Sequence, residues 1–253
     1  MCSTCGCGDE TGARVIDLSV DNAHTDNAHT HHHDHEHPHT ERTVVLEEQV
    51  LAKNNLVAER NRGWLQGRGV RALNLMSSPG SGKTTLLERT IRDLADESIT
   101  VIEGDQETTF DAERIKATGA RVVQVNTGAG CHLDADMIHR ALHTLDPRTG
   151  SLLFIENVGN LVCPALFDLG EAGRVVIMSV TEGVDKPLKY PHMFTGADVV
   201  VLNKIDLLPY VEFEPAEFTH RLSTVNRKAA ILPVSATRGE GLTDWYDWIR
   251  DHP

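Results

Sequence analysis

A run of small and cationic residues, Ser77-Ser78-Pro79-Gly80-Ser81-Gly82-Lys83-Thr84-Thr85, directly follows an apolar segment over residues 70–76. Because glycines lack side chains, successive backbone N–H groups can surround phosphate oxygens, and a helix that begins here points its positive dipole end at the same anion. Lys83 offers a charge for the β and γ phosphates, and Thr84 offers a hydroxyl for Mg²⁺. An ordinary glycine turn between strand and helix is the plainer interpretation. The pattern nevertheless predicts a P-loop, with Ser77 in place of its first glycine and phosphate contacts from Gly80, Ser81, Gly82, Lys83, Thr84 and Thr85.

The base is predicted from a second motif, Asn203-Lys204-Ile205-Asp206, which follows an apolar segment over residues 198–202. The Asp206 carboxylate can accept hydrogen bonds from guanine N1–H and the 2-amino group, whereas adenine offers neither donor there. Ser235 and Ala236 follow a further apolar segment and are suited to placing a backbone N–H against guanine O6. Alone, the four residues would fit a solvated loop. After a P-loop they favour GTP, bound by Asn203, Lys204, Asp206, Ser235 and Ala236.

Two acidic residues complete the expected hydrolytic site. Asp105 lies just beyond an apolar segment over 99–103, and Glu156 ends another over 151–156. Phosphoryl transfer depends mainly on positioning and charge. We therefore expect Lys83, Asp105 and Glu156 to carry catalysis, and Thr84, Asp105 and Glu156 to hold Mg²⁺. No arginine finger is apparent in the sequence, so slow turnover is expected unless a second molecule completes the site.

A separate group of residues has metal-ligand chemistry. Cys131 and His132 follow the segment over 121–125, and Cys163 lies in the loop after Glu156. Thiolates with an imidazole suit Zn²⁺, Ni²⁺ or Cu⁺. Three ligands are one short of a closed structural zinc site, which favours an exchangeable, water-capped or shared metal. The alternative is that both cysteines simply pack as small apolar side chains.

The first 41 residues repeat the metal theme. Cys2, Cys5 and Cys7 place three thiols within six positions, and eight histidines crowd sixteen positions: His24, His29, His31, His32, His33, His35, His37 and His39. A purification tag would be uninterrupted, whereas Asp34, Glu36 and Pro38 break this row. With eight acidic residues, one arginine and few large apolar side chains, the segment is expected to be disordered and to capture or store divalent ions weakly.

Beyond residue 41, apolar strands alternate with helical stretches, which predicts a mostly parallel sheet covered by helices on both faces. Ligands in such sheets bind at the carboxyl ends of the strands, where every motif above falls. We therefore expect an α/β P-loop NTPase fold over 42–253 and a metal-binding tail over 1–41. The predicted strands span 70–76, 99–103, 121–125, 151–156, 174–180, 198–202 and 230–234. The predicted helices span 43–65 (amphipathic), 83–95, 110–118, 134–145, 215–226 and 242–250.

The overall composition limits the possible partners. The chain has 253 residues and a formal net charge of −13, which argues against nucleic acid because phosphate neutralisation needs a basic face. No apolar stretch approaches the length of a membrane span, and the N-terminus lacks the apolar region of a signal peptide. We therefore expect a cytoplasmic location, where the five cysteines would be thiols or metal ligands.

Together these motifs, with Asn126-Thr127-Gly128-Ala129-Gly130-Cys131-His132 and Glu156-Asn157-Val158-Gly159-Asn160-Leu161-Val162-Cys163-Pro164, resemble HypB, the family of hydrogenase nickel-incorporation GTPases within the SIMIBI class. The similarity covers residues 42–250. The resemblance implies a GTPase that dimerises with nucleotide, carries metal at Cys131, His132 and Cys163 near the dimer interface, and helps deliver Ni²⁺ to the large subunit of a [NiFe]-hydrogenase. It also implies the nickel protein HypA, and in some members the chaperone SlyD, as partners. Cys2, Cys5 and Cys7 match a second nickel motif that only some members have.

Two other functions remain open at this stage. A urease-type nickel GTPase would carry a Cys-Pro-His motif, whereas here Cys131-His132 and Cys163-Pro164 are separate. A nickel storage protein with an incidental GTPase would depend on the histidine-rich tail. The sequence leaves open whether the internal site holds Ni²⁺ or Zn²⁺, since thiolate and imidazole serve both.

Overall fold

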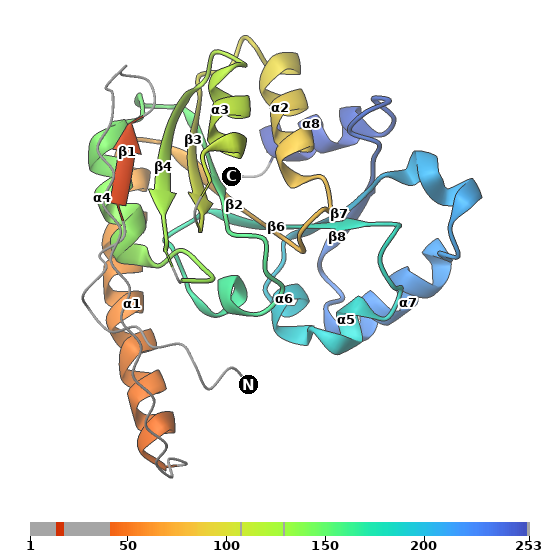
Figure 1. Cartoon of the computed structure of the whole chain (residues 1–253), viewed down its shortest axis with the longest axis horizontal. Helices are drawn as coiled ribbons and strands as arrows, with labels where there is room; N and C mark the ends of the chain where they lie inside the picture. The colour runs from red at the N-terminus through yellow and green to blue at the C-terminus, as the bar shows by residue number, and fades with distance from the viewer. Residues whose placement is uncertain (1–13, 18–40, 107, 129, 252–253) are drawn as a thin grey trace.

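The computed structural model describes residues 14–17, 41–106, 108–128 and 130–251, which build one eight-stranded sheet with helices on both faces (Figure 1). The strand order is β1-β4-β3-β5-β2-β6-β7-β8. All neighbouring strands run parallel except β1, which pairs antiparallel with β4. The strands are β1 (Arg14–Asp17), β2 (Arg71–Ser77), β3 (Ile99–Asp105), β4 (Arg121–Asn126), β5 (Leu152–Glu156), β6 (Gly173–Ser179), β7 (Val199–Asn203) and β8 (Ala230–Pro233).

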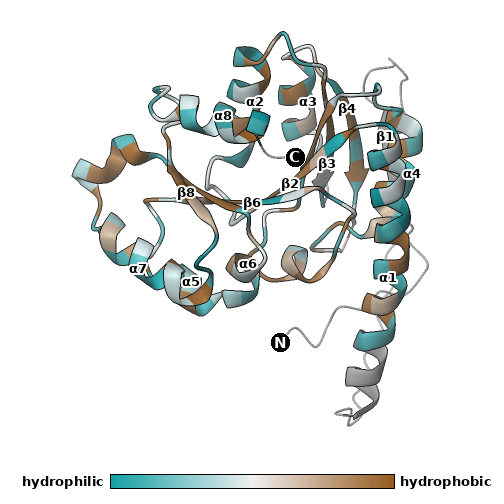
Figure 2. Cartoon of the chain, turned by 180° about the vertical axis from the view of Figure 1, so that it is seen from behind, coloured by the Kyte–Doolittle hydropathy of each residue, from teal (hydrophilic) through white to brown (hydrophobic). Residues whose placement is uncertain are grey.

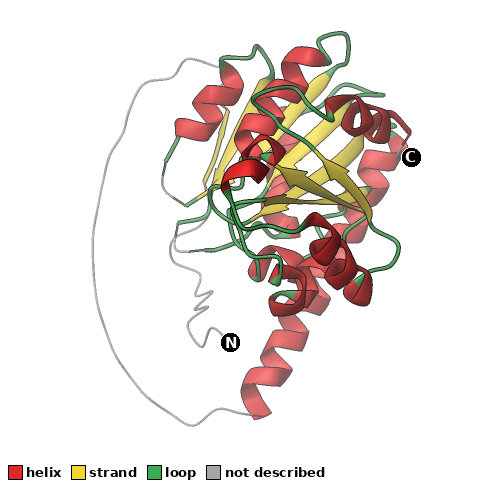
Figure 3. Cartoon of the chain, turned by 90° about the vertical axis from the view of Figure 1, so that its right-hand side faces the viewer, coloured by secondary structure: helices red, strands yellow, loops and turns green. Residues whose placement is uncertain are grey.

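From β2 onward, α-helices connect successive strands, as expected for parallel crossovers, except between β5 and β6, which loops and a 3₁₀ turn connect (Figure 3). The α-helices are α1 (Glu41–Gly67), α2 (Lys83–Asp93), α3 (Phe110–Lys116), α4 (Ala135–Leu145), α5 (Lys186–Lys189), α6 (Pro191–Thr195), α7 (Pro215–Val225) and α8 (Leu242–Asp251), with short 3₁₀ turns over Cys163–Leu166 and Ile205–Tyr210. The predicted α/β class with a mostly parallel sheet is confirmed, and each predicted strand and helix beyond residue 41 lies within two residues of its predicted bounds.

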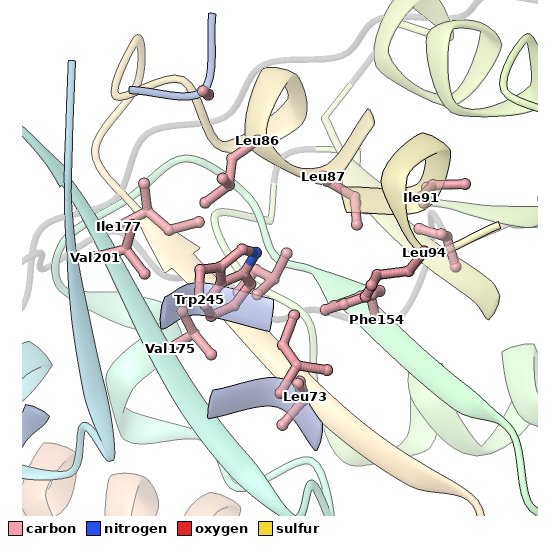
Figure 4. Close-up of a cluster of buried hydrophobic side chains, with 14 of the residues drawn as sticks. Leu73, Leu86, Leu87, Ile91, Leu94, Phe154, Val175, Ile177, Val201 and Trp245 are labelled. Carbon is pink, nitrogen blue, oxygen red and sulfur yellow. The ribbon is translucent and has the colours of Figure 1, made fainter. Parts of the chain in front are cut away.

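One face of the sheet is covered by α2, α3 and α8. Leu86, Leu87 and Ile91 of α2 pack on strand residues such as Leu73 and Phe154, all of them buried. Figure 4 shows Trp245 of α8 at the centre of this cluster. The Trp245 indole N–H donates to Thr90 Oγ1 at 2.9 Å, which satisfies its buried polar atom. This packing fixes α2, and therefore the loop that precedes it, against the central strands.

The opposite face is covered in two halves. α4 and the end of α1 pack on β4, β3 and β5, whereas α6 and α7 pack on β6 and β7. The strands carry long brown stretches in the hydropathy colouring, and the coloured part of α1 alternates between brown and teal (Figure 2). The second half buries Phe194 of α6 and Phe218 of α7 completely. In the described part of the chain, no helix combines the length and the apolarity needed to cross a membrane.

The structure corrects two expectations about the N-terminal region. Residues 14–17, which fall in the segment expected to be disordered, form β1, where Arg14 pairs with Asn126 of β4. The amphipathic helix exists, but over residues 48–67 its buried face mixes amides with apolar side chains. Ala58 and Leu65 are buried together with Asn54 and Asn61, whereas the apolar Val50 and Leu51 are exposed and half-buried. Two amides are buried there because they bind loop backbone, as described below.

Candidate nucleotide and metal site

The predicted P-loop joins the end of β2 to the start of α2, at the carboxyl edge of the sheet. Gly82 adopts a left-handed conformation with φ 93°. A Cβ atom at this position would lie 2.5 Å from Asn203 Nδ2, so a residue other than glycine would push the loop away from β7. Asn203 Nδ2 instead donates to Ser81 O at 2.9 Å. Asn203 of the predicted base-binding motif thus fixes the shape of the predicted phosphate loop.

Lys83 and Thr84 both bind the same carboxylate oxygen. Lys83 Nζ lies 2.8 Å from Glu156 Oε1, and the Thr84 hydroxyl donates to that oxygen at 2.6 Å. The Glu156 side chain is fully buried. Its second oxygen, Oε2, and Ser81 Oγ are buried without a hydrogen-bond partner among the described residues. A hydroxyl, a carboxylate and an ammonium around such polar atoms fit a Mg²⁺–triphosphate ligand.

Asp105 is placed differently. Its Oδ2 accepts hydrogen bonds from the backbone N–H and the hydroxyl of Thr108, at 3.0 and 2.5 Å. The structure therefore brings Lys83, Thr84 and Glu156 together and leaves the Asp105 side chain in its own loop. The Thr108 carbonyl in turn accepts from the Gln124 side chain of β4, which ties this loop to the neighbouring strand.

Four of the five predicted base-binding residues, all but Ser235, line one pocket of about 320 Å³. The pocket is formed by Gly82, Thr85, Asn203, Lys204, Asp206, Leu207, Ala236 and Thr237. Asp206 Oδ1 accepts from Ser235 Oγ at 2.6 Å, which orients the carboxylate. Lys204 is in the left-handed region, and its Nζ donates to Gly80 O at 2.6 Å. The Ala236 N–H, expected to face guanine O6, donates to Asn203 Oδ1 at 3.2 Å.

The three internal metal candidates converge. One potential ligand atom from each of Cys131, His132 and Cys163 lies within 4.8 Å of the other two. The two sulfur atoms are 2.7 Å apart, and Cys131 Sγ lies 3.8 Å from His132 Nδ1. The His132 ring stacks on Phe167 with centroids 3.9 Å apart. The pKa of His132 is lowered, mainly because the ring is buried. The charge of Asp134 acts in the opposite direction but has a smaller effect on this pKa. The imidazole is thereby kept in the neutral form that binds metals.

Two buried amides of α1 hold together the loops that carry Cys131 and Cys163. Asn54 accepts from Ala135 N at 2.8 Å and donates to Asp168 O at 2.7 Å. Asn61 donates to Ala135 O at 2.8 Å and to Leu169 O at 3.1 Å. Ala135 follows the Cys131 loop, and the 168–169 segment follows the Cys163 loop. Helix α1 therefore supports the site that the two loops form.

Hydrogen bonds link the loops of the candidate metal site to those of the candidate nucleotide site. Asn157, next to Glu156, accepts from Leu133 N at 3.2 Å through its Oδ1. Thr127 N donates to Asp105 O at 2.9 Å, and its hydroxyl donates to Gly130 O at 2.7 Å. A movement of either the Asp105 or the Glu156 loop would therefore displace residues beside Cys131.

Several residues of the site were not predicted as such. Glu182 accepts from Ser78 Oγ at 2.5 Å and from Ser179 N at 3.0 Å, which anchors the start of the phosphate loop. Glu103 lies beside Glu156 in the parallel ladder. Its burial raises its pKa to about 9, and the neighbouring Glu156 charge adds to the effect. A carboxylate inside an otherwise apolar strand segment was the available signal for Glu103. Cys2, Cys5, Cys7 and the histidine-rich run lie outside the described residues.

Residues 71–233 match the family model of the CobW/HypB/UreG nucleotide-binding domain. The chain is 57% identical over 210 residues to the hydrogenase maturation factor HypB of Rhizobium leguminosarum bv. viciae, covering 83% of this chain and 70% of that protein. Its identity to HypB of Escherichia coli K12 is 54% over 209 residues, covering 82% and 72%.

Solved structures agree with these matches. HypB from Archaeoglobus fulgidus superposes with a TM-score of 0.73 at 40% identity, covering 79% of this chain and 98% of that one. HypB from Helicobacter pylori, solved in complex with nickel, gives a TM-score of 0.76 at 38% identity, covering 79% and 94%. The fold and site define a nucleotide-binding protein of the P-loop NTPase class. Within that class the chain belongs to the HypB family of hydrogenase maturation factors, as the sequence motifs predicted.

Proposed function

We propose that this protein is a GTP-hydrolysing nickel metallochaperone that assists nickel insertion into a [NiFe]-hydrogenase. One observation carries the proposal: Glu156, bound by Lys83 and Thr84 of the phosphate loop, begins the loop that brings Cys163 against Cys131. The relatives above are named as hydrogenase maturation factors, and one was solved with nickel. A storage role alone would not need this shared loop.

In the proposed reaction, the P-loop backbone and Lys83 hold the GTP phosphates, while Asp206 selects guanine. Thr84, Glu156 and Asp105 would hold Mg²⁺, which supplies charge neutralisation for phosphoryl transfer to water. For Asp105 to take part, its loop must release Thr108 and turn toward Thr84. Such an ordering step would accompany binding of the γ-phosphate. We propose slow intrinsic turnover because this loop is not held beside Glu156 beforehand.

Nickel is the proposed cargo of Cys131, His132 and Cys163, and zinc can occupy the same donors. Two features near Cys163 support a nucleotide-dependent homodimer at this face. The apolar side chains of Val162 and Leu166 are 49% and 45% exposed, and the proposed metal site beside them is one ligand short of the four of a tetrahedral site, which a second subunit can supply. We further propose a HypA-like nickel protein, the hydrogenase large subunit and a SlyD-like chaperone as partners. We also propose a cytoplasmic location, because the proposed thiol ligands must stay reduced to bind metal.

The test measures nickel affinity of the full chain with GDP and with a non-hydrolysable GTP analogue, while sedimentation reports dimerisation. Thiolate-to-nickel charge-transfer absorption reports nickel bound to cysteine. Cys2, Cys5 and Cys7 are replaced by serine, so that this absorption comes from the Cys131 site. We expect the two nucleotides to give different affinities at the Cys131 site. Identical affinities and identical assembly with both nucleotides would contradict a GTP-driven carrier and favour storage.

A further inference from the structure

Two histidines on α4 lie outside both the nucleotide site and the thiol site. His139 and His143 are one helical turn apart, so their side chains are neighbours on the helix surface. Their ring centroids are 4.6 Å apart with an interplanar angle of 86°. His139 is half-buried and His143 is exposed. The pair faces α1, which lies beside α4 in Figure 1.

The tautomer of neutral His139 is fixed by Asn61 of α1. Asn61 is fully buried, and its amide nitrogen already donates to Ala135 O and Leu169 O. Asn61 Oδ1 is therefore an acceptor, and its contact with His139 Nδ1 at 3.1 Å requires the proton on that nitrogen. In neutral His139, Nε2 then carries the free lone pair. A hydrogen bond to the other ring nitrogen is the arrangement that orients histidine ligands in metal sites.

The neighbouring groups are compatible with a bound cation. Asp136, one turn before His139 on its N-terminal side, is paired with Arg140 at 3.3 Å. Trp64 of α1 lies 6.5 Å from the His143 ring, and Arg68 covers Trp64 at 4.2 Å from its centroid. Arg60 is the nearby positive charge that opposes binding. A metal–nitrogen bond is about 2.1 Å, so a centroid separation of 4.6 Å is short enough for one ion to bind both rings once the exposed His143 side chain turns a nitrogen toward His139 Nε2.

We propose that His139 and His143 form a second metal site at the contact between α1 and α4, which holds a borderline divalent cation such as Ni²⁺ or Zn²⁺ in rapid exchange. Imidazole ligands suit these ions, and two protein ligands leave the remaining positions to water. The site is separate from the Cys131 centre but lies on the helix that begins three positions after His132. It goes beyond the proposed function, because it requires neither GTP nor thiolates. With two protein ligands, a cation held there would be weakly bound.

The experiment measures how fast diethylpyrocarbonate acylates each histidine of the full chain, by peptide mapping. The Ni²⁺ concentration is increased in the absence of nucleotide. We expect Ni²⁺ to slow acylation of His139 and His143 in parallel, with one midpoint, while His192 and His220 on other helices react unchanged. In His143→Gln, protection of His139 should be lost at the same nickel concentration. The matched His220→Gln variant should keep it. Both substituted residues are exposed, so folding is retained.

Three outcomes would overturn the proposal. They are no protection of His139 and His143 in the parent chain, separate midpoints for the two residues, or unchanged protection of His139 in His143→Gln. The last result would mean that the two rings only pack against each other. Thiolate-to-nickel absorption recorded on the same samples reports the thiol centre, so a failure of this site is distinguished from a failure of nickel binding by the proposed carrier.

Discussion

Leu133 lies against Gly104 so closely that a Cβ atom at position 104 would be 2.7 Å from the Leu133 side chain. Gly104 precedes Asp105 at the end of β3, and Leu133 follows His132. The contact joins the loop expected at the γ-phosphate to the loop that carries two of the proposed metal ligands. Together with the Asn157–Leu133 hydrogen bond, it gives each of the two proposed nucleotide-binding loops a direct contact with the residue next to the proposed metal site. Coupling between the two sites therefore needs no distant pathway.

Lys83→Ala is expected to abolish GTP hydrolysis, because the variant lacks the phosphate-binding charge. The substitution also leaves the buried Glu156 carboxylate without its cation. Removing one partner of a buried ion pair lowers the free energy of unfolding by about 3 kcal/mol. Phosphate release and thermal unfolding measure the two effects. Lys189→Ala is the control, since the Lys189 side chain is 63% exposed in its pair with Asp185. Hydrolysis that persists in a folded Lys83→Ala variant would remove Lys83 from its assigned role.

Asp206→Asn is expected to change the base preference. The amide offers a donor where the carboxylate accepted from the guanine 2-amino group, so GTP binding should weaken by about tenfold or more, equivalent to ~1.4 kcal/mol. Xanthosine triphosphate, with a carbonyl at that position, should gain affinity. Competition with a fluorescent guanine nucleotide measures both. Asp244→Asn, on the exposed side of α8, should change neither, and an Asp206→Asn variant that still prefers GTP would argue against this base contact.

Cys131→Ala is expected to weaken nickel binding at the internal site by about tenfold or more, or ~1.4 kcal/mol, without lowering the unfolding temperature appreciably. The measurement is thiolate-to-nickel charge-transfer absorption in the background where Cys2, Cys5 and Cys7 are serine. Cys163→Ala should behave alike, because its sulfur lies beside that of Cys131. If both variants keep the absorption and instead unfold more easily, the two cysteines are packing residues.

The sequence predicted the sheet and the main site because their signals are local. The alternation of apolar runs with helical stretches predicts a parallel sheet, and the glycines with Lys83 and Thr84 define the phosphate loop within nine positions. The strand ends then bring Glu156 and Asn203 to the same edge. Cys131 and Cys163 could be paired because both follow parallel strands, and parallel strands end at one edge.

What could not be predicted depends on contacts between distant positions. Asn61 and Ala135 are 74 positions apart, so the spacing of apolar residues in α1 gave no sign that buried amides form its inner face. α5 and α6 are too short for helical periodicity to stand out. Residues 14–17 form a strand only because β4 offers its edge. Glu103 faces Glu156 through the strand register, which no pattern within a single strand determines.

Asn61→Ala is expected to destabilise the protein by about 2–3 kcal/mol, because the carbonyls of Ala135 and Leu169 lose their buried donor. Leu56→Ala on the same helix should change stability by less than about 0.5 kcal/mol, since Leu56 is 75% exposed. Urea unfolding compares the two. Nickel affinity of the Cys131 site should fall in Asn61→Ala, because α1 no longer holds the loops around it. Equal effects of the two substitutions would contradict this role of α1.

The buried carboxyl group of Glu103 is expected to make the stability of the protein fall as the pH rises. Burial, assisted by the charge of Glu156, raises the pKa of Glu103 from 4.5 to about 9 in the folded protein. The folded state therefore binds the proton more tightly than the unfolded state, so the contribution to stability is complete below about pH 4.5 and is lost as the pH rises to about 9.

Glu103→Gln keeps a neutral side chain of similar shape at every pH. The variant should lose less stability than the parent between about pH 5 and pH 9 in urea unfolding, whereas Glu97→Gln, at an exposed position, should retain the parental slope. Parallel curves for Glu103→Gln and the parent would mean that Glu103 is already ionised in the folded protein, with water or a cation reaching the carboxylate beside Glu156.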